Sequence, residues 1–107
     1  MVETEYVVDL HSHTTCSDGE LEPINLVTLA AENGIRALAI TDHDTVEAYE
    51  DPDLYENARK LGVRLVEGVE ISTQDELGRM HVLGLDIDAR HTGLKQWLNT
   101  LDRKSVV

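Results

Sequence analysis

The chain has 107 residues, which is enough for one domain. Its formal net charge of −12 argues against a basic surface for nucleic acid and against attraction to an anionic membrane. Hydrophobic residues make up 41% of the chain, so a packed core is expected rather than disorder.

Strands and helices are predicted to alternate through the first two thirds of the chain. The strands are expected at residues 5–10, 36–40 and 63–67. The first helix is expected to begin at Pro23, where a missing N–H costs nothing, and to end at Asn33-Gly34. The second is expected between the N-cap Asp51 and Gly62. This alternation predicts an α/β fold with a parallel sheet covered by helices.

A hairpin and a last helix are predicted to follow. Residues 69–73 and 80–85 flank a turn-like cluster at 75–78. The last helix is expected at about residues 92–104, with Leu94, Trp97, Leu98 and Leu101 on one face. His91, just before it, is expected to be a surface histidine.

Cysteine content and hydropathy predict a cytoplasmic protein. Cys16 is the only cysteine, so there can be no intrachain disulfide and no cysteine-based zinc site. Residues 1–5 have neither the basic nor the apolar region of a secretory signal. No apolar run approaches the ~18 residues that a membrane span needs. We therefore expect no membrane partner and no extended nucleic-acid surface.

Two histidines follow the first predicted strand directly. Residues i and i+2 of an extended backbone point to the same side, so His11 and His13 can reach one metal ion. Asp9 lies on that side too and is expected to orient one of them. Asp18 follows in a loop that Gly19 allows to fold back. The alternative for Asp18 is a turn or cap residue.

Further donors follow the next predicted strands. His43 lies between Asp42 and Asp44 after the second strand, where α/β folds collect ligands. Glu70 follows the third strand, and His81 lies in the hairpin. Apolar neighbours predict that both are buried, and a buried Glu or His needs a charge partner or a hydrogen bond. The alternative for His81 is a core histidine bonded to backbone.

These donors together predict a metal site. A parallel sheet brings the ends of its strands to one rim, and nitrogen and oxygen donors suit Mn, Fe or Zn. The candidate metal ligands are His11, His13, Asp18, His43, Glu70 and His81.

The motifs that carry these residues resemble the PHP family, the polymerase and histidinol phosphatase domains. They lie at residues 9–13, 17–19, 40–45, 68–72 and 81–84, in the order of the family, within a motif-bearing region of residues 6–85. The resemblance implies a distorted (βα)7 TIM-like barrel with two or three divalent ions at its C-terminal rim. Residues 1–107 would then be the N-terminal part of a PHP domain.

The resemblance also implies roles for the candidate ligands. His11 and His13 would hold the first ion, and Glu70 would bridge the first and second. His81 would belong to the second ion, and Asp18 and His43 to the third. No later residue offers the Asp-x-His pair that the family takes from its C-terminal half.

The implied activity is a metal-dependent phosphoesterase, a hydrolase that uses a metal-activated water and no side-chain nucleophile. Its substrates would be small phosphorylated molecules, nucleotides or RNA ends. Asp42 and Asp44 are expected to orient His43 or to pass protons. The alternatives are a catalytically silent metal-binding module and an amidohydrolase-like enzyme. The second often uses a bridging lysine, and no lysine here follows a predicted strand.

The length of the chain predicts an incomplete barrel. A barrel of this kind normally needs ~250 residues, and 107 residues hold only three or four strands. We expect an inactive or oligomerising fragment in which the first strand has an open edge that pairs with another chain. The missing ligands would come from a C-terminal half or from self-association.

Overall fold

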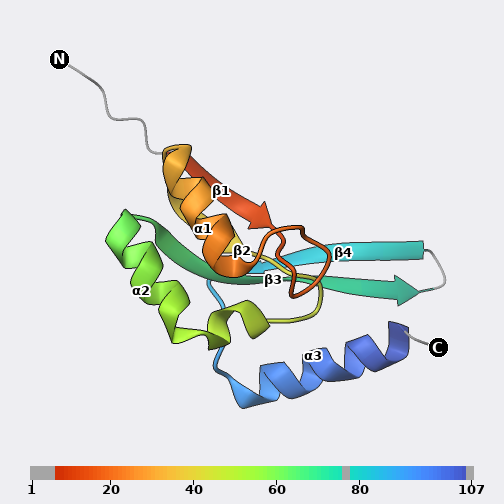
Figure 1. Ribbon diagram of the computed structural model, residues 1–107. Helices are drawn as coiled ribbons and strands as arrows, with labels where there is room; N and C mark the ends of the chain where they lie inside the picture. Colours follow the sequence, from red (N-terminus) through yellow and green to blue (C-terminus); the bar gives the residue numbers. More distant parts are fainter. Residues whose placement is uncertain (1–6, 76–77, 106–107) are drawn as a thin grey trace.

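A four-stranded sheet is the framework of the structure, a computed structural model that describes residues 7–75 and 78–105. Its strands are β1 (Val7–Ser12), β2 (Ile35–Ile40), β3 (Arg64–Asp75) and β4 (Gly78–Leu85), paired in that order. The first three are parallel, and β4 runs antiparallel to β3. The sheet curls from β1 to the hairpin (Figure 1). The predicted α/β class is confirmed.

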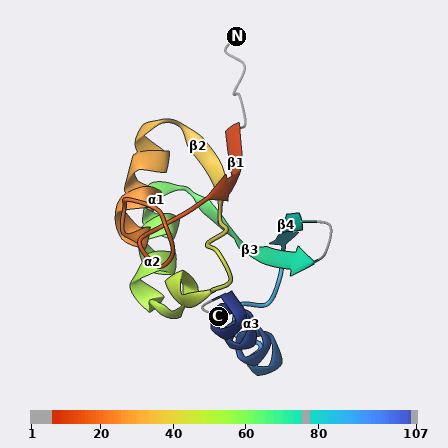
Figure 2. The same ribbon diagram turned by 90° about the vertical axis from the view of Figure 1, so that its right-hand side faces the viewer.

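Two helices cover one face of the parallel strands (Figures 1 and 2). These are α1 (Pro23–Glu32) and α2 (Pro52–Leu61), the second preceded by a 3-10 turn, η1 (Glu47–Glu50). Asp51 caps α2 as predicted, because its side chain accepts a hydrogen bond from the N–H of Asp53. Gly62 ends the helix in the left-handed conformation that glycine adopts without strain. The core between helices and sheet is centred on the fully buried Val27, Leu38, Ile40 and Leu54.

The last helix, α3 (Thr92–Ser105), lies beside the hairpin rather than on the α1–α2 layer (Figure 1). Leu98 is buried, and Leu94 and Leu101 pack against the core. Trp97, predicted on the same face, is 46% exposed and is not part of the buried contact. Leu94, Leu98 and Leu101 already complete the i, i+4, i+7 stripe, which leaves Trp97 at its margin. His91 is exposed as predicted, and its Nδ1 accepts from the N–H of Leu94 at the start of the helix.

The third strand is longer than predicted. Residues 63–67 and 69–73 were expected to be separate strands, but β3 runs through both. It pairs with β2 as far as Glu67 and with β4 from Gly68 onward. A Cβ on Gly68 would lie 2.9 Å from the side chain of Thr41, so glycine allows a close approach here instead of breaking the strand. Glu70 consequently lies within a strand, not after one.

One hydroxyl group joins β2 to β3 where the strands approach the rim. The buried Tyr49 Oη lies 2.6 Å from the carbonyl of Ile40 and 3.1 Å from that of Val66, and can donate to either. It accepts from the N–H groups of Ile40 and Gly68. Burial raises the pKa of Tyr49, so the hydroxyl keeps its proton.

Within the described residues, no helix has the length and apolarity needed to cross a membrane.

Tyr49→Phe should lower the free energy of unfolding by about 1–3 kcal/mol, because it leaves buried backbone groups without their partner. Urea denaturation followed by circular dichroism measures the change. Tyr55→Phe is the matched control, since its hydroxyl bonds a half-buried carboxylate, Glu67, and no backbone group. An unchanged midpoint for Tyr49→Phe would show that β2 and β3 do not depend on this hydroxyl.

Candidate metal centre

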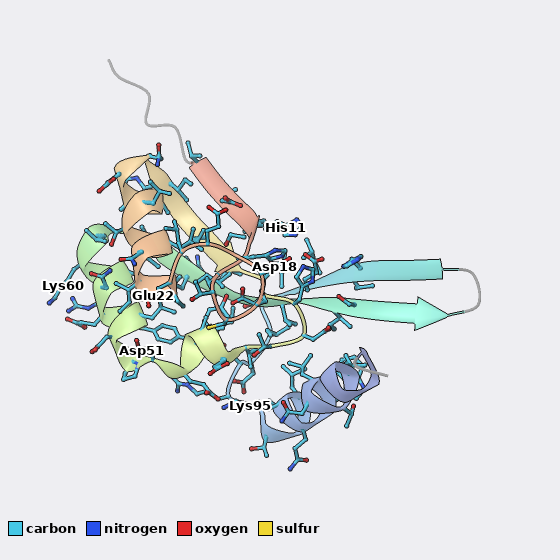
Figure 3. The ribbon with its side chains drawn as sticks, turned by 45° about the vertical axis from the view of Figure 1, so that its right-hand side comes forward. His11, Asp18, Glu22, Asp51, Lys60 and Lys95 are labelled. Carbon is cyan, nitrogen blue, oxygen red and sulfur yellow. The ribbon has the colours of Figure 1, made fainter. Side chains whose placement is uncertain are left out.

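All six predicted ligands lie together near the rim of the sheet. Three sets of donor atoms, with all atoms of a set within 4.8 Å of one another, contain His11, His13 and Glu70; His13, Asp18 and His43; and His43, Glu70 and His81. His11 and Asp18 face the region where the hairpin leaves the sheet (Figure 3). Neutral imidazole and carboxylate are the donors that Mn, Fe and Zn accept, so the residues present fit divalent ions.

Glu70 is the centre of the cluster. It is 5% exposed, and its two carboxylate oxygens face four imidazoles. Oε1 lies 2.6 Å from His11 Nε2 and 2.9 Å from His13 Nε2. Oε2 lies 2.7 Å from His81 Nδ1 and 3.4 Å from His43 Nδ1. A carboxylate with one oxygen toward each pair of rings has the arrangement of a bridging ligand.

The imidazoles also keep Glu70 ionised. Burial alone would raise the pKa of this carboxyl, but hydrogen bonds from His13 and His11 and the charge of His43 outweigh it and lower the pKa of Glu70 to about 2. The carboxylate is therefore available to a cation at neutral pH.

Asp18 closes the cluster from the loop between β1 and α1. Its Oδ1 lies 2.9 Å from His13 Nδ1, and its Oδ2 lies 3.1 Å from His43 Nε2. His13 and His43 thus each face Glu70 through one ring nitrogen and Asp18 through the other. A neutral imidazole offers one lone pair, so each of these rings can ligate one ion and must donate from its other nitrogen.

The loop that carries Asp18 folds back onto His13. A Cβ on Gly19 would lie 2.3 Å from the carbonyl oxygen of His13 and 2.7 Å from the nitrogen of Thr14. Both contacts are with main chain, which cannot move aside cheaply. Glycine is therefore required here by close approach, as the sequence predicted from the foldback.

Glu70 and His81 were both predicted to be buried. The prediction is confirmed for Glu70 and wrong for His81, because 49% of the His81 side chain is exposed. The apolar neighbours of His81 do not bury it, because they are exposed on both faces of β4: Leu83, on the same face as His81, is 39% exposed, and Val82, on the other face, is 45% exposed. The alternative of a core histidine bonded to backbone is wrong as well, since His81 contacts Glu70.

Asp9, Asp42 and Asp44 were predicted to orient imidazole rings, but their carboxylates bond main-chain or loop groups instead. The β1–β2 register has an extra residue on β1 between Asp9 and Ser12, and there the Asp9 carboxylate accepts from the N–H of His11. Asp42 bonds loop residues, and Asp44 accepts from the N–H of Ser72. Asp44 has a φ of 55°, which turns the chain after a single bridge between His43 and Glu70.

Ser72 is a site residue that the sequence analysis missed. Its hydroxyl lies 3.4 Å from His43 Nδ1 and 3.5 Å from His81 Nδ1. A signal for it existed: Ser72 is two residues after Glu70 in an extended strand, and so shares its side.

The chain matches the family model of the PHP domain over residues 9–101. The chain belongs to the PHP domain family. It is 45% identical to the 5'-3' exoribonuclease Rnm of Salmonella typhimurium, covering 90% of this chain and 33% of that protein. It is 32% identical to a 3',5'-nucleoside bisphosphate phosphatase of Chromobacterium violaceum, covering 88% of this chain and 32% of that protein.

The fold also matches that of a solved structure. An amidohydrolase from Chromobacterium violaceum, with bound sulfate and no metal, superposes with a TM-score of 0.83 at 30% identity, covering 92% of this chain and 34% of that one. The PHP chain described here thus spans about a third of the length of each of these three proteins. Its curled sheet corresponds to part of a barrel, as the resemblance implied.

Gly19→Ala should separate Asp18 from His13 by pushing the loop off the β1 end, and should lower the free energy of unfolding by about 1–3 kcal/mol through overpacking. Thermal unfolding measures the loss, and Gly93→Ala is a control at a glycine whose nearest neighbour is a side-chain ring. A Gly19→Ala protein as stable as the parent would contradict the close approach.

Proposed function

We propose that this PHP chain provides metal ligands of a metal-dependent phosphoesterase. The observation that carries the proposal is the shared carboxylate of Glu70, with one oxygen toward His11 and His13 and the other toward His43 and His81. Divalent ions, when bound, supply neutralisation of phosphate charge and acidification of water. The names of the relatives support phosphate-ester hydrolysis.

The ligand roles follow the resemblance and the contacts. We propose that His11 and His13 hold one ion, that Glu70 bridges it to a second at His81, and that Asp18 and His43 hold a third. Mn, Fe and Zn all fit these donors. His13 would donate from its free ring nitrogen to Asp18, which keeps both side chains oriented. No side-chain nucleophile is needed, and we assign no such role to Cys16, because burial raises the pKa of its thiol.

The proposed substrates are nucleotides or RNA ends, with hydrolysis at a phosphate ester. The relatives that support this are an exoribonuclease and a nucleoside bisphosphate phosphatase. The net charge of −12 makes an extended nucleic-acid surface unfavourable, so the site would take a short anionic end held by its own cations. We also propose that the protein is cytoplasmic.

The remaining ligands would come from residues beyond this chain or from a second copy. Support comes from β1, which has no strand on its outer side among the described residues and exposes Val7, Val8 and Leu10. An unpaired apolar edge strand pairs readily with another chain. Light scattering on the purified chain distinguishes an oligomer from a monomer.

Glu70→Gln should abolish divalent-metal retention and lower hydrolysis at least ~100-fold, because an amide replaces the shared carboxylate. Elemental analysis per chain measures the first. Release of phosphate or nitrophenol from nucleoside bisphosphate, 5'-phosphorylated oligoribonucleotide and bis(p-nitrophenyl) phosphate measures the second, with and without added Mn²⁺.

Glu56→Gln is the matched control, since Glu56 pairs with Arg59 on the exposed side of α2. Metal content unchanged in Glu70→Gln would overturn the proposed site. Metal bound by the parent chain, with no hydrolysis of any ester, would favour the silent module. Hydrolysis of amides alone would favour the amidohydrolase alternative.

A further inference from the structure

The buried carboxylate of Asp42 bonds a neighbouring loop instead of the adjacent His43. Asp42 is 1% exposed, and both of its oxygens are bonded to the loop between β1 and α1. Oδ1 accepts from the N–H of Thr14 at 2.6 Å and from the hydroxyl of Ser17 at 2.7 Å. Oδ2 accepts from the hydroxyl of Thr14 at 2.7 Å. With both oxygens bonded to donors, Asp42 is not placed to ligate a cation.

Thr14 transmits this anchoring to Asp18. Thr14 is fully buried, and its carbonyl accepts from the N–H of Ser17 at 3.0 Å and from the N–H of Gly19 at 2.8 Å. The residues on both sides of Asp18 are therefore bonded to the residue that Asp42 holds. Asp18 itself is exposed, with 61% of its side chain accessible, so burial does not fix its position.

The main chain of Asp42 is attached to the other half of the cluster. Its carbonyl accepts from the N–H of Glu70 at 3.0 Å, and the N–H of Asp44 donates to the carbonyl of Glu70 at 2.9 Å. His43 lies between these two bonds, opposite Glu70. Asp42 thus joins the loop that carries Asp18 to the strand that carries Glu70, with His43 next to it in the chain.

We propose that Asp42 is a positioning residue that sets the distance from Asp18 to His43, and so controls cation binding by these two ligands. The inference rests on the proposed metal site and adds a residue to it that holds the loop without touching an ion. A carboxylate suits the task because its two oxygens accept all three hydrogen bonds, and charge-assisted bonds of this kind are short and strong.

Asp42→Ala in the full chain is the first test, with Mn²⁺ as the probe and calorimetric titration as the measurement. We expect Mn²⁺ affinity at one site to fall about 10–100-fold, the usual effect of removing a partner that orients a ligand. The remaining sites should keep their affinity. Asp18→Asn serves as the reference, because it removes the same site directly, and Asp42→Ala should reproduce its pattern.

Glu67→Ala is the control for loss of a hydrogen-bonded, half-buried carboxylate elsewhere in the fold. Glu67 accepts from the N–H of Ala89 and from the hydroxyl of Tyr55, away from the loop. This variant should lose stability without selective loss of one site. Equal weakening of every Mn²⁺ site in Asp42→Ala would overturn the proposal, because it would show a general structural role; so would unchanged affinity.

A second measurement needs no metal. Amide hydrogen exchange at Ser17 and Gly19 should accelerate in Asp42→Ala and stay slow in Glu67→Ala, since Asp42 bonds Thr14 and Glu67 bonds Ala89 and Tyr55 instead. If Asp42→Ala fails to fold, Ser17→Ala and Asp42→Asn replace it: each keeps part of the contact and should give an intermediate acceleration. Exchange as slow as in the parent chain in both of these variants would overturn the proposal.

The outcome is separable from that of the proposed function. Selective loss of one Mn²⁺ site in a chain that hydrolyses no phosphate ester would support the positioning role and contradict the phosphoesterase. Hydrolysis by the parent chain, with Mn²⁺ binding and amide exchange unchanged in Asp42→Ala, would do the reverse.

Discussion

The buried carboxylate of Glu70 is the constraint on which the rest of the site depends. A carboxylate with 5% exposure is costly to ionise unless donors or cations surround it. Here four imidazoles from two strand ends and the hairpin do so, and they outweigh burial. The same geometry that stabilises the anion arranges nitrogen donors in pairs around its two oxygens.

The path of β3 makes this arrangement possible. Up to Glu67 the strand pairs in parallel with β2, and from Gly68 it pairs with β4, so Glu70 lies at the change of partner. There the segment around His43 can approach β3 through a single bridge instead of a full ladder. The hydroxyl of Tyr49 completes backbone hydrogen bonding on the buried side. Where β2 and β3 separate, the backbone groups on the buried side are thus hydrogen-bonded to Tyr49, and the other side is available to metal ligands.

Acidic side chains near the cluster have different tasks. Glu70 and Asp18 face the imidazoles, whereas Asp42 and Asp44 bond main-chain and hydroxyl donors that hold the neighbouring segments. Their negative charges add to a field that favours cations in a protein of net charge −12. Membership of the PHP family, together with this division of tasks, gives the phosphoesterase proposal its chemical basis.

Local signals in the sequence were sufficient for most elements and for all six residues of the cluster. Pro23, Asp51 and Gly62 have backbone or capping preferences that act within a few residues, so the ends of α1 and α2 were predictable. His11 and His13 share a side of the chain for the same local reason. The continuity of β3 was not predictable, because a glycine often marks a break in a strand, whereas Gly68 is required by the close approach of Thr41.

The sequence by itself determined which donors the chain offers and that the ends of parallel strands would bring His11, His13 and His43 to one rim. Only the tertiary structure decided how they are held: that Asp42 anchors a loop rather than an imidazole, that Ser72 joins the site, and that His81 stays exposed. The physical reason is the distance along the chain over which each interaction acts. Strand period and helix caps act over a few residues, whereas these three outcomes depend on contacts between segments or on which side of the sheet is covered.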